Sequence, residues 1–468
     1  MRFVSRDWIT SRMWCGHALG GSARARSILF VCVLVSGLAF GLWAEAETQK
    51  EASGPSQTAA ELPEAGKGYP QGLLINSSNA SAYKGLIVPG LYGDVRAGKL
   101  EFDAVRRLPY EWSFDEDWKN AKTLSPKALG AQGALAPTVR WDRGFVWGDR
   151  TRLSREKSLD KLAAKLLWNV HSNFWSQKIV TLAFSLKEFS QSGGVSGWEL
   201  QGDLSRVYPG SLVPDDKTGQ LFREIIRLRA PAPLAGYAWL TFRFLGADED
   251  VVYIFSPALE KPRELTASNR EDGFAASALS VDDFFVWSGK PSLLALVDLK
   301  KITALTPLAV SEQGRARSQG KHCALISASS SPETEAQQLH QPDSFQGGVW
   351  PGGNLIYAPR ELWRMELVSS DPFSLYGRQV LYVDSESMLP VFKFVYDQGG
   401  VFWKSIVGAI GLAQGEGQRA YPFIASQIIR DYKAGKVWRL NYSNIRYCRQ
   451  FPDGLELGAF QPGRLGPK

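Results

Sequence analysis

The sequence predicts a mainly β protein of the α+β class, built on a large curved antiparallel sheet or incomplete barrel with a few helices on one side. Two observations carry this prediction. A long series of aromatic-rich segments alternates apolar and polar residues, as the strands of an antiparallel sheet do. One segment, near residues 159–174, has clear helical spacing instead. With 468 residues, the chain is long enough to bury a sizeable core.

The chain begins with a segment typical of exported proteins. Arg24 and Arg26 precede an apolar run over residues 28–43, and small residues allow cleavage after Ala46. We therefore expect residues 1–46 to be a signal peptide. A transmembrane anchor is the competing interpretation, but the run is shorter than the roughly 20 residues that a membrane span requires.

The remainder divides into a tether and one domain. Residues 47–68 are rich in Ala, Glu, Gly, Pro and Ser, a composition that cannot bury enough apolar surface to fold, so we expect a flexible tether. The domain is expected over residues 69–460. Within it, residues 310–348 lose periodicity, which predicts a long loop or an insertion. The apolar stretch over residues 401–413 contains two glycines and is interpreted as a mobile lid or a buried bend.

One helix and a series of strands are expected in the domain. The helix covers Leu159–Phe174 and should pack on the sheet, with His171 at its surface or boundary. The strands are expected near residues 180–187, 198–208, 222–229, 237–245, 251–256, 281–287, 361–369, 378–384, 389–397, 423–432 and 437–442.

The alternation predicts one strongly apolar side of the sheet, which is the candidate ligand-binding face. Its members are Leu240, Phe242, Phe244, Trp363, Met365, Phe392, Phe394, Trp438 and Leu440. The opposite, wet side is expected to carry Arg243, Arg364, Glu366, Lys393 and Arg439. Because little helix is available to cover so many strands, an open concave face that binds lipid is favoured. A core filled by its own side chains stays open as the alternative.

Some charged residues are candidates for polar contacts. Arg263, Arg360 and Arg364 could bind an anionic headgroup, since guanidinium groups match phosphate and carboxylate, and structural salt bridges are the alternative. The acids at residues 248–250 and 282–283 could do acid–base chemistry or hold a cation. Turn formation and capping of backbone groups are the favoured interpretation.

Other classes of function find no support in the sequence. No nucleotide-binding, hydrolase or metalloprotease motif occurs, and the four histidines are scattered, so we expect no catalytic residue, metal or cofactor. The net charge of +7 comes from Lys and Arg interleaved with Asp and Glu, which argues against nucleic acid. Cys323 and Cys448 remain after cleavage of the leader. An oxidising compartment would allow a disulfide between them, but their separation in sequence leaves the pairing open.

Several motifs carry a resemblance to a known family. They are Ser280-Val281-Asp282-Asp283, Gly289-Lys290-Pro291, Leu362-Trp363-Arg364-Met365-Glu366 and Arg378-Gln379-Val380-Leu381-Tyr382-Val383-Asp384. Over most of residues 70–460, the chain resembles a large family of bacterial secreted proteins, a domain-of-unknown-function family labelled outer-membrane lipoprotein-sorting proteins. That family is similar to the LolA/LolB superfamily of lipoprotein carriers. The chain departs from the pattern at residues 143–146 and in the insertion over residues 310–348.

The resemblance implies an incomplete antiparallel barrel that helices close on one side and that is open to an acyl chain. It also implies the periplasm of a Gram-negative bacterium, with the outer membrane or an inner-membrane exporter of the resistance-nodulation-division type as partner. We expect a non-catalytic carrier or receptor for a hydrophobic ligand, either a lipid or a lipoprotein acyl chain. An envelope scaffold that binds another protein is the alternative, and a carboxylate enzyme is the least supported. The oligomeric state stays open.

Overall fold

The computed structural model describes residues 61–64, 72–107, 129–130, 134–135, 147, 153–172, 178–189, 195–213, 218–246, 249–265, 271–309, 314–319, 322–327, 355–414 and 420–466. These residues belong to a unit that spans residues 56–468. The predicted signal peptide and most of the predicted tether lie outside the described residues, as do residues 143–146.

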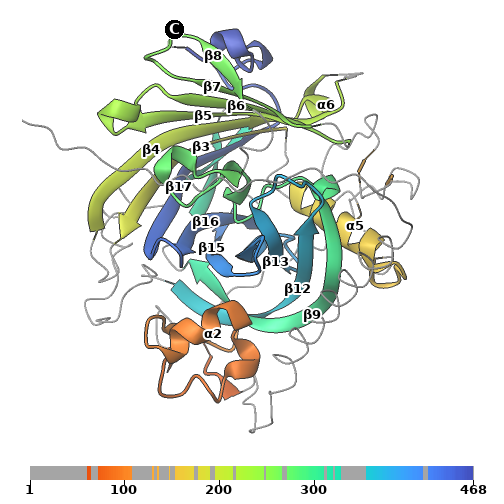
Figure 1. The fold of residues 1–468 in the computed structure, drawn as a ribbon, viewed down its shortest axis with the longest axis vertical. Helices are drawn as coiled ribbons and strands as arrows, with labels where there is room; N and C mark the ends of the chain where they lie inside the picture. The colour runs from red at the N-terminus through yellow and green to blue at the C-terminus, as the bar shows by residue number, and fades with distance from the viewer. Residues whose placement is uncertain are drawn as a thin grey trace, which may run out of the picture. The chain divides into compact units, whose positions relative to one another are not determined.

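Strands dominate the described part of the chain (Figure 1). The first nine are β1 (Leu73–Ile75), β2 (Phe102–Ala104), β3 (Ile179–Phe189), β4 (Val195–Val207), β5 (Gln220–Ala230), β6 (Ala238–Phe244), β7 (Val251–Phe255), β8 (Pro262–Leu265) and β9 (Leu294–Ala309). The others are β10 (Gly314–Gln319), β11 (Cys323–Ser327), β12 (Leu355–Ser369), β13 (Tyr376–Asp384), β14 (Pro390–Asp397), β15 (Phe402–Gln414), β16 (Ala420–Asp431) and β17 (Lys436–Cys448).

The strands form one large curved sheet, with antiparallel neighbours in the order β8-β7-β6-β5-β4-β3-β17-β16-β15-β14-β13-β12-β9. Strand β9 pairs with β12 along its whole length and also meets β15 in parallel at Leu308 and Ile410. The strip from β9 to β15 therefore returns onto itself. The prediction of a mainly β protein with a large curved antiparallel sheet is confirmed.

Few helices accompany the sheet in the described part of the chain. They are α2 (Pro89–Arg96), α5 (Leu159–His171) and α6 (Pro209–Leu212), with short 3-10 turns η2 (Lys84–Leu86), η6 (Ala232–Leu234), η8 (Phe274–Ala276), η9 (Val281–Asp283), η10 (Pro291–Leu293), η12 (Leu457–Ala459) and η13 (Pro462–Arg464). Ser158 caps the N-terminus of α5, since its side chain accepts a hydrogen bond from the Lys161 amide. Helix α5 buries the predicted apolar stripe from Leu162 to Val170, whereas Leu159 is 52% exposed and Phe174 lies outside the described residues.

Two sequence predictions differ from the structure. Residues 281–287 are not a strand, because they belong to the irregular segment 271–293 that links β8 to β9. Residues 401–413 are neither a lid nor a bend, because most of them form the central strand β15. The expected loop over residues 310–348 contains the hairpin β10–β11, while residues 328–354 lie outside the described part. Strand β9 was not predicted.

The predicted wet side of the sheet is also wrong for three of its residues. Arg243, Lys393 and Arg439 are only 2%, 1% and 3% exposed. For Arg243 and Lys393 the reason is that segment 271–293 covers them and supplies their counter-charges. Both faces of the sheet are therefore buried over much of its width. The alternation of apolar and polar residues does not indicate which face is exposed to solvent.

Candidate ligand-binding site

Segment 271–293, called the crossing segment below, lies across one face of the sheet from β6 to β13. Its aromatic side chains pack on the strands beneath: the Phe274 ring lies 4.5 Å from Trp239 of β6, and the Phe284 ring lies 5.7 Å from Phe184 of β3. The Phe285 ring stacks on Tyr442 of β17 at 5.1 Å. The interior side of the sheet is therefore occupied by side chains of the chain itself.

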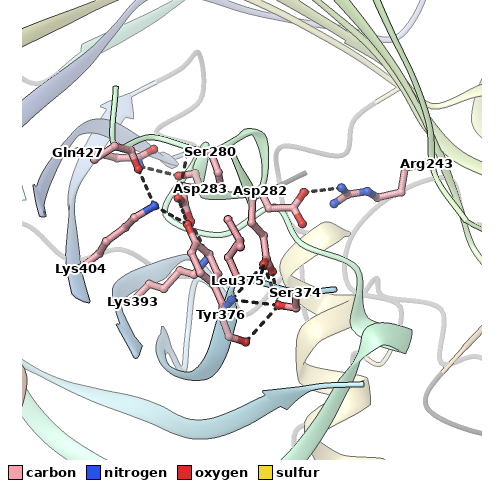
Figure 2. A network of polar contacts seen from close by, with 12 residues as sticks. Arg243, Ser280, Asp282, Asp283, Ser374, Leu375, Tyr376, Lys393, Lys404 and Gln427 are labelled. Carbon is pink, nitrogen blue, oxygen red and sulfur yellow. Dashed lines mark hydrogen bonds and ion pairs between the residues drawn. The ribbon is translucent and has the colours of Figure 1, made fainter. Parts of the chain in front are cut away.

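The crossing segment is held by buried charges as well as by apolar packing (Figure 2). Asp283 accepts hydrogen bonds from Lys393 Nζ at 2.6 Å and from the Tyr376 hydroxyl at 2.8 Å. Lys404 Nζ donates to Tyr376 Oη at 2.9 Å, and Gln427 donates to the Asp283 carbonyl at 2.8 Å. These partners come from four neighbouring strands, β13 to β16. The carboxylate of Asp283 binds the side chains of β13 and β14, while the backbone carbonyls of Asp283 and Ala278 accept from Gln427 of β16 and Lys404 of β15.

A second anchor lies next to the first. Asp282 accepts from Arg243 at 2.6 Å, and Arg243 also pairs with Asp250 at 2.8 Å. Asp283 additionally accepts from the Ser280 amide at 3.1 Å, so part of the acidic pair caps a turn. The interpretation of this pair as a structural feature is therefore consistent with the geometry.

The electrostatics of the network fit an anchoring role. Burial by itself would raise the pKa of Asp283, but the ammonium groups of Lys393 and Lys404 outweigh burial and lower it. Burial lowers the pKa of Lys404 and raises that of Tyr376 well above its usual value. Tyr376 therefore stays protonated at neutral pH and donates to the ionised Asp283.

His171 supports the other end of the crossing segment. It is 4% exposed, so its placement at the surface or boundary is wrong, because Trp287 packs over its ring at 5.1 Å. Burial, together with the nearby Arg243, lowers its pKa to about 3. The neutral ring donates from Nε2 to the Gly289 carbonyl at 2.8 Å.

The backbone of the crossing segment is strained. Ala275, Ala276, Phe285 and Val286 have positive φ values of 48°, 63°, 58° and 70°. For residues with a Cβ this region is unfavourable by roughly 1–2 kcal/mol each, and a β-branched residue such as Val286 rarely adopts it. The contacts described above therefore hold the segment in a conformation that its own residues disfavour.

The structure divides the predicted ligand-binding face between the two sides of the sheet. By strand register, Trp363, Met365, Trp438 and Leu440 lie on the side of the crossing segment. The remaining members, Leu240, Phe242, Phe244, Phe392 and Phe394, lie on the opposite side. There Leu240 packs with Phe460 and Leu465 near the C-terminus, and the Phe394 ring lies against Gly90 of α2.

A pocket of about 500 Å³ opens beside β9 and β12. Its lining residues are Leu153, Ser154, Lys301, Pro359, Arg360, Glu361, Trp363, Ser385, Glu386 and Met388. Leu153 and Met388 belong to the main hydrophobic core, and Trp363 packs against that core. The pocket therefore combines an apolar floor with four charged side chains, and it contains two of the residues that the sequence singled out, Arg360 and Trp363.

The predicted headgroup arginines do not converge. Arg263 is exposed on the edge strand β8, far along the sheet from β12, which carries Arg360 and Arg364. Arg360 pairs with Asp384 and with Glu386, at 2.5 and 2.8 Å. Arg364 pairs with Asp298 and Glu366, at 2.6 and 2.7 Å. Only Arg360 lines the pocket.

The sequence analysis did not single out Lys301, Glu361 or Glu386. Lys301 lies on the unpredicted strand β9, and the other two are acids in ordinary exposed or turn positions, so no local pattern distinguishes them. Cys323 and Cys448 are joined by a disulfide between β11 and β17. Among the described residues, no helix has the length and apolarity to cross a membrane, and no three or more His, Cys, Asp or Glu residues form a metal-binding group.

Comparison with known proteins identifies a family. A profile of the family described as protein of unknown function (DUF1329) matches residues 159–462, which confirms the resemblance carried by the sequence motifs. No protein of curated function matches the chain.

Three solved structures are similar to this one. The first carries the name outer membrane lipoprotein-sorting protein domain and comes from Vibrio parahaemolyticus, with 15% identity, a TM-score of 0.39, and coverage of 62% of this chain and 91% of that one. A DUF1329 family protein from Desulfovibrio piger has 14% identity, a TM-score of 0.41, and coverage of 65% and 95%. A LolA superfamily protein from Nitrosomonas europaea has 16% identity, a TM-score of 0.34, and coverage of 64% and 97%.

Proposed function

This chain belongs to the DUF1329 family, and we propose that it is a non-catalytic periplasmic carrier or receptor for a hydrophobic ligand whose apolar chain takes the place of the crossing segment. The observation that carries the proposal is the strained backbone of that segment, which packs its aromatic side chains over the interior face. A segment with unfavourable φ values costs less free energy to displace than a relaxed one, because its backbone strain is released when it leaves the sheet. The face beneath it would then expose Met365, Trp438 and Leu440 to the ligand.

The burial of apolar surface favours such an exchange, and the buried ion pairs of the crossing segment oppose it. Each methylene group removed from water contributes roughly 0.8 kcal/mol, so a long acyl chain can offset the loss of the segment's own apolar contacts. The buried ion pairs of Asp282 and Asp283 would keep the segment in place when no ligand is present. Signal-peptide cleavage at Ala46, delivery to the outer membrane and cooperation with an inner-membrane exporter belong to this proposal.

An engineered disulfide tests the proposal directly. A Cβ added at Gly408 would lie 2.3 Å from Val286 Cγ2, so the pair Val286→Cys and Gly408→Cys should lock the crossing segment onto β15. We expect the oxidised double variant to lose uptake of a fluorescent fatty acid and to regain it on reduction. Each single variant and the wild-type protein, given the same reductant, control for the native Cys323–Cys448 bond.

Two results would overturn the carrier proposal. One is equal uptake by the oxidised and the reduced double variant, which would show that uptake does not require the crossing segment to leave the sheet. The other is wild-type protein that takes up no fatty acid and from which native mass spectrometry of periplasmic material detects no copurifying lipid.

A protein-binding scaffold is the second candidate, and exposed hairpin turns favour it. Phe373 and Leu375, between β12 and β13, are 72% and 41% exposed, and Val401, between β14 and β15, is 57% exposed. The two turns lie at the same end of the sheet, since Tyr376 pairs with Asp397. A scaffold should lose its protein partner when Phe373 and Val401 are changed to Ser, while a carrier should still take up fatty acid.

A further inference from the structure

The ammonium group of Lys301, in the pocket beside β9 and β12, has the contacts that a bound cationic ligand would have. Lys301 and Trp363 are cross-strand neighbours, and Lys301 Nζ lies 4.7 Å from the centre of the Trp363 ring. The same atom donates to Glu361 Oε1 at 2.6 Å. A primary ammonium group thus lies between an aromatic face and a carboxylate, which is the arrangement that proteins use to bind cationic ligands.

This internal ion pair can be exchanged. The side chains of Lys301 and Glu361 are 42% and 53% exposed, so neither must be pulled out of the core to separate them. Ion pairs of this exposure contribute little to stability, so their separation costs little. Arg360 is the other cation of the pocket, and its guanidinium group is bound to Asp384 and Glu386.

Charge balance selects the class of ligand. An anion that binds to Lys301 would leave Glu361 without its ammonium partner, and a cation that binds to Glu361 would leave Lys301 without its carboxylate. A zwitterion keeps both groups paired, because its ammonium can replace that of Lys301 while its anionic group pairs with Lys301. The apolar floor formed by Leu153 and Met388 would accept the part of the ligand that follows the headgroup.

We propose that the pocket binds a zwitterionic headgroup of the phosphoethanolamine class, with the ligand's primary ammonium between Glu361 and Trp363 and its phosphate on Lys301. This inference rests on the proposed carrier function, for which it names the polar end of the ligand. The pocket would bind the headgroup of the ligand. The crossing segment would instead compete with the acyl chain for the interior face of the sheet.

The chain offers a matched control for the site. Lys433 Nζ lies 4.7 Å from the Trp403 ring and pairs with Asp397, so a lysine, a tryptophan and a carboxylate meet a second time. The Lys433 side chain is 43% exposed, close to the value for Lys301. Neither Lys433, Trp403 nor Asp397 lines the pocket beside β9 and β12.

Calorimetric titration of the mature protein tests the proposal. We expect phosphoethanolamine to bind about tenfold more tightly than inorganic phosphate or ethylamine, because only the zwitterion engages both charged groups. Glu361→Gln and Trp363→Leu should each weaken phosphoethanolamine binding by about tenfold. Asp397→Asn should leave it unchanged. Equal affinities for the three probes, or equal effects of Glu361→Gln and Asp397→Asn, would overturn the proposal.

A second titration identifies the source of the headgroup and separates the two proposals. Glycerophosphoethanolamine carries the headgroup alone, and monomeric lysophosphatidylethanolamine adds one acyl chain. If both proposals hold, the lysolipid binds more tightly than glycerophosphoethanolamine. The oxidised Val286→Cys/Gly408→Cys variant should then bind the two probes with equal affinity, because it loses only the contribution of the acyl chain. Equal binding of the two probes would leave a site for a soluble zwitterion and would reject the carrier. Lysolipid uptake that is insensitive to Glu361→Gln would retain the carrier and reject the headgroup site.

Discussion

At the scale of single residues, Asp283 contributes most to the placement of the crossing segment. It is fully buried and joins Lys393 and Tyr376 to the turn that begins at Ser280. Lys393 and Lys404 are themselves 1% and 2% exposed. A buried carboxylate between two buried ammonium groups cannot be removed without leaving positive charge in the core.

We therefore predict that Asp283→Asn lowers the free energy of unfolding by about 3–5 kcal/mol, the usual effect of breaking a buried ion pair. Urea unfolding of the purified variant measures the change. Asp397→Asn is the control, because its partner Lys433 is exposed and exposed pairs contribute little to stability. Equal losses for the two variants would contradict the assigned role of Asp283.

At the scale of elements, the crossing segment is unusual because it is irregular and yet almost completely buried. Its path depends on left-handed residues at two places, and on Gly408 of β15, where the absence of a side chain lets Val286 approach the strand. A regular strand or helix along residues 281–287 would present its side chains on fixed faces. The irregular path instead allows Asp282 and Asp283, adjacent in sequence, to reach β6 and β14 respectively.

The strain of this element can be measured at Ala276, which is exposed and has a φ of 63°. We predict that Ala276→Gly raises the free energy of unfolding by about 0.5–1 kcal/mol, because glycine adopts this region without a steric penalty. Ala97→Gly, at an exposed residue with a φ of −80°, should lower it by a similar amount through backbone entropy. Thermal or urea unfolding measures both changes. If the two substitutions change the free energy of unfolding in the same direction, the backbone at Ala276 is not strained.

At the scale of the whole molecule, buried carboxylates make the stability depend on pH. Burial alone would raise the pKa of Asp283 and Asp384, but Lys393 and Arg360, respectively, outweigh burial and lower both values. A carboxyl group with a lowered folded-state pKa stabilises the protein above its unfolded pKa, near 4, and loses that contribution as the pH falls. Glu271 acts in the opposite direction, since burial raises its pKa.

We predict that the free energy of unfolding of the wild-type protein falls as the pH drops below about 4. Asp283→Asn lacks one of the groups responsible, so its stability should fall less steeply and approach that of the wild type. Urea titrations at a series of pH values give the two curves. If the free energies of unfolding of the two proteins fall in parallel over the acid range, Asp283 does not have the lowered pKa that the structure implies.

The sequence and the structure agree best where a pattern is local. The stripe of α5 from Leu162 to Val170 and the alternation within β6, β14 and β17 are correct, because residue spacing alone decides which side chains share one face of an element. The sequence pattern does not predict β9, and it predicts a lid or a bend in place of β15. Local features explain both errors. Alternation in β9 is interrupted by Lys300 and Lys301, and Gly408 and Gly411 weaken the strand signal of β15.

For the candidate site, the sequence by itself determined an apolar, aromatic-rich antiparallel sheet and the motif at Ser280–Asp283, and it named Arg360 and Trp363 as separate candidate residues. Only the tertiary structure decided which faces of different strands coincide, because the phase of alternation in one strand contains no information about its neighbours. Phe394 and Leu440 therefore lie on opposite sides although each strand was read correctly. The pairing of Lys301 with Glu361 and of Lys393 with Asp283 likewise depends on strands far apart in sequence, which contact each other only in the folded sheet.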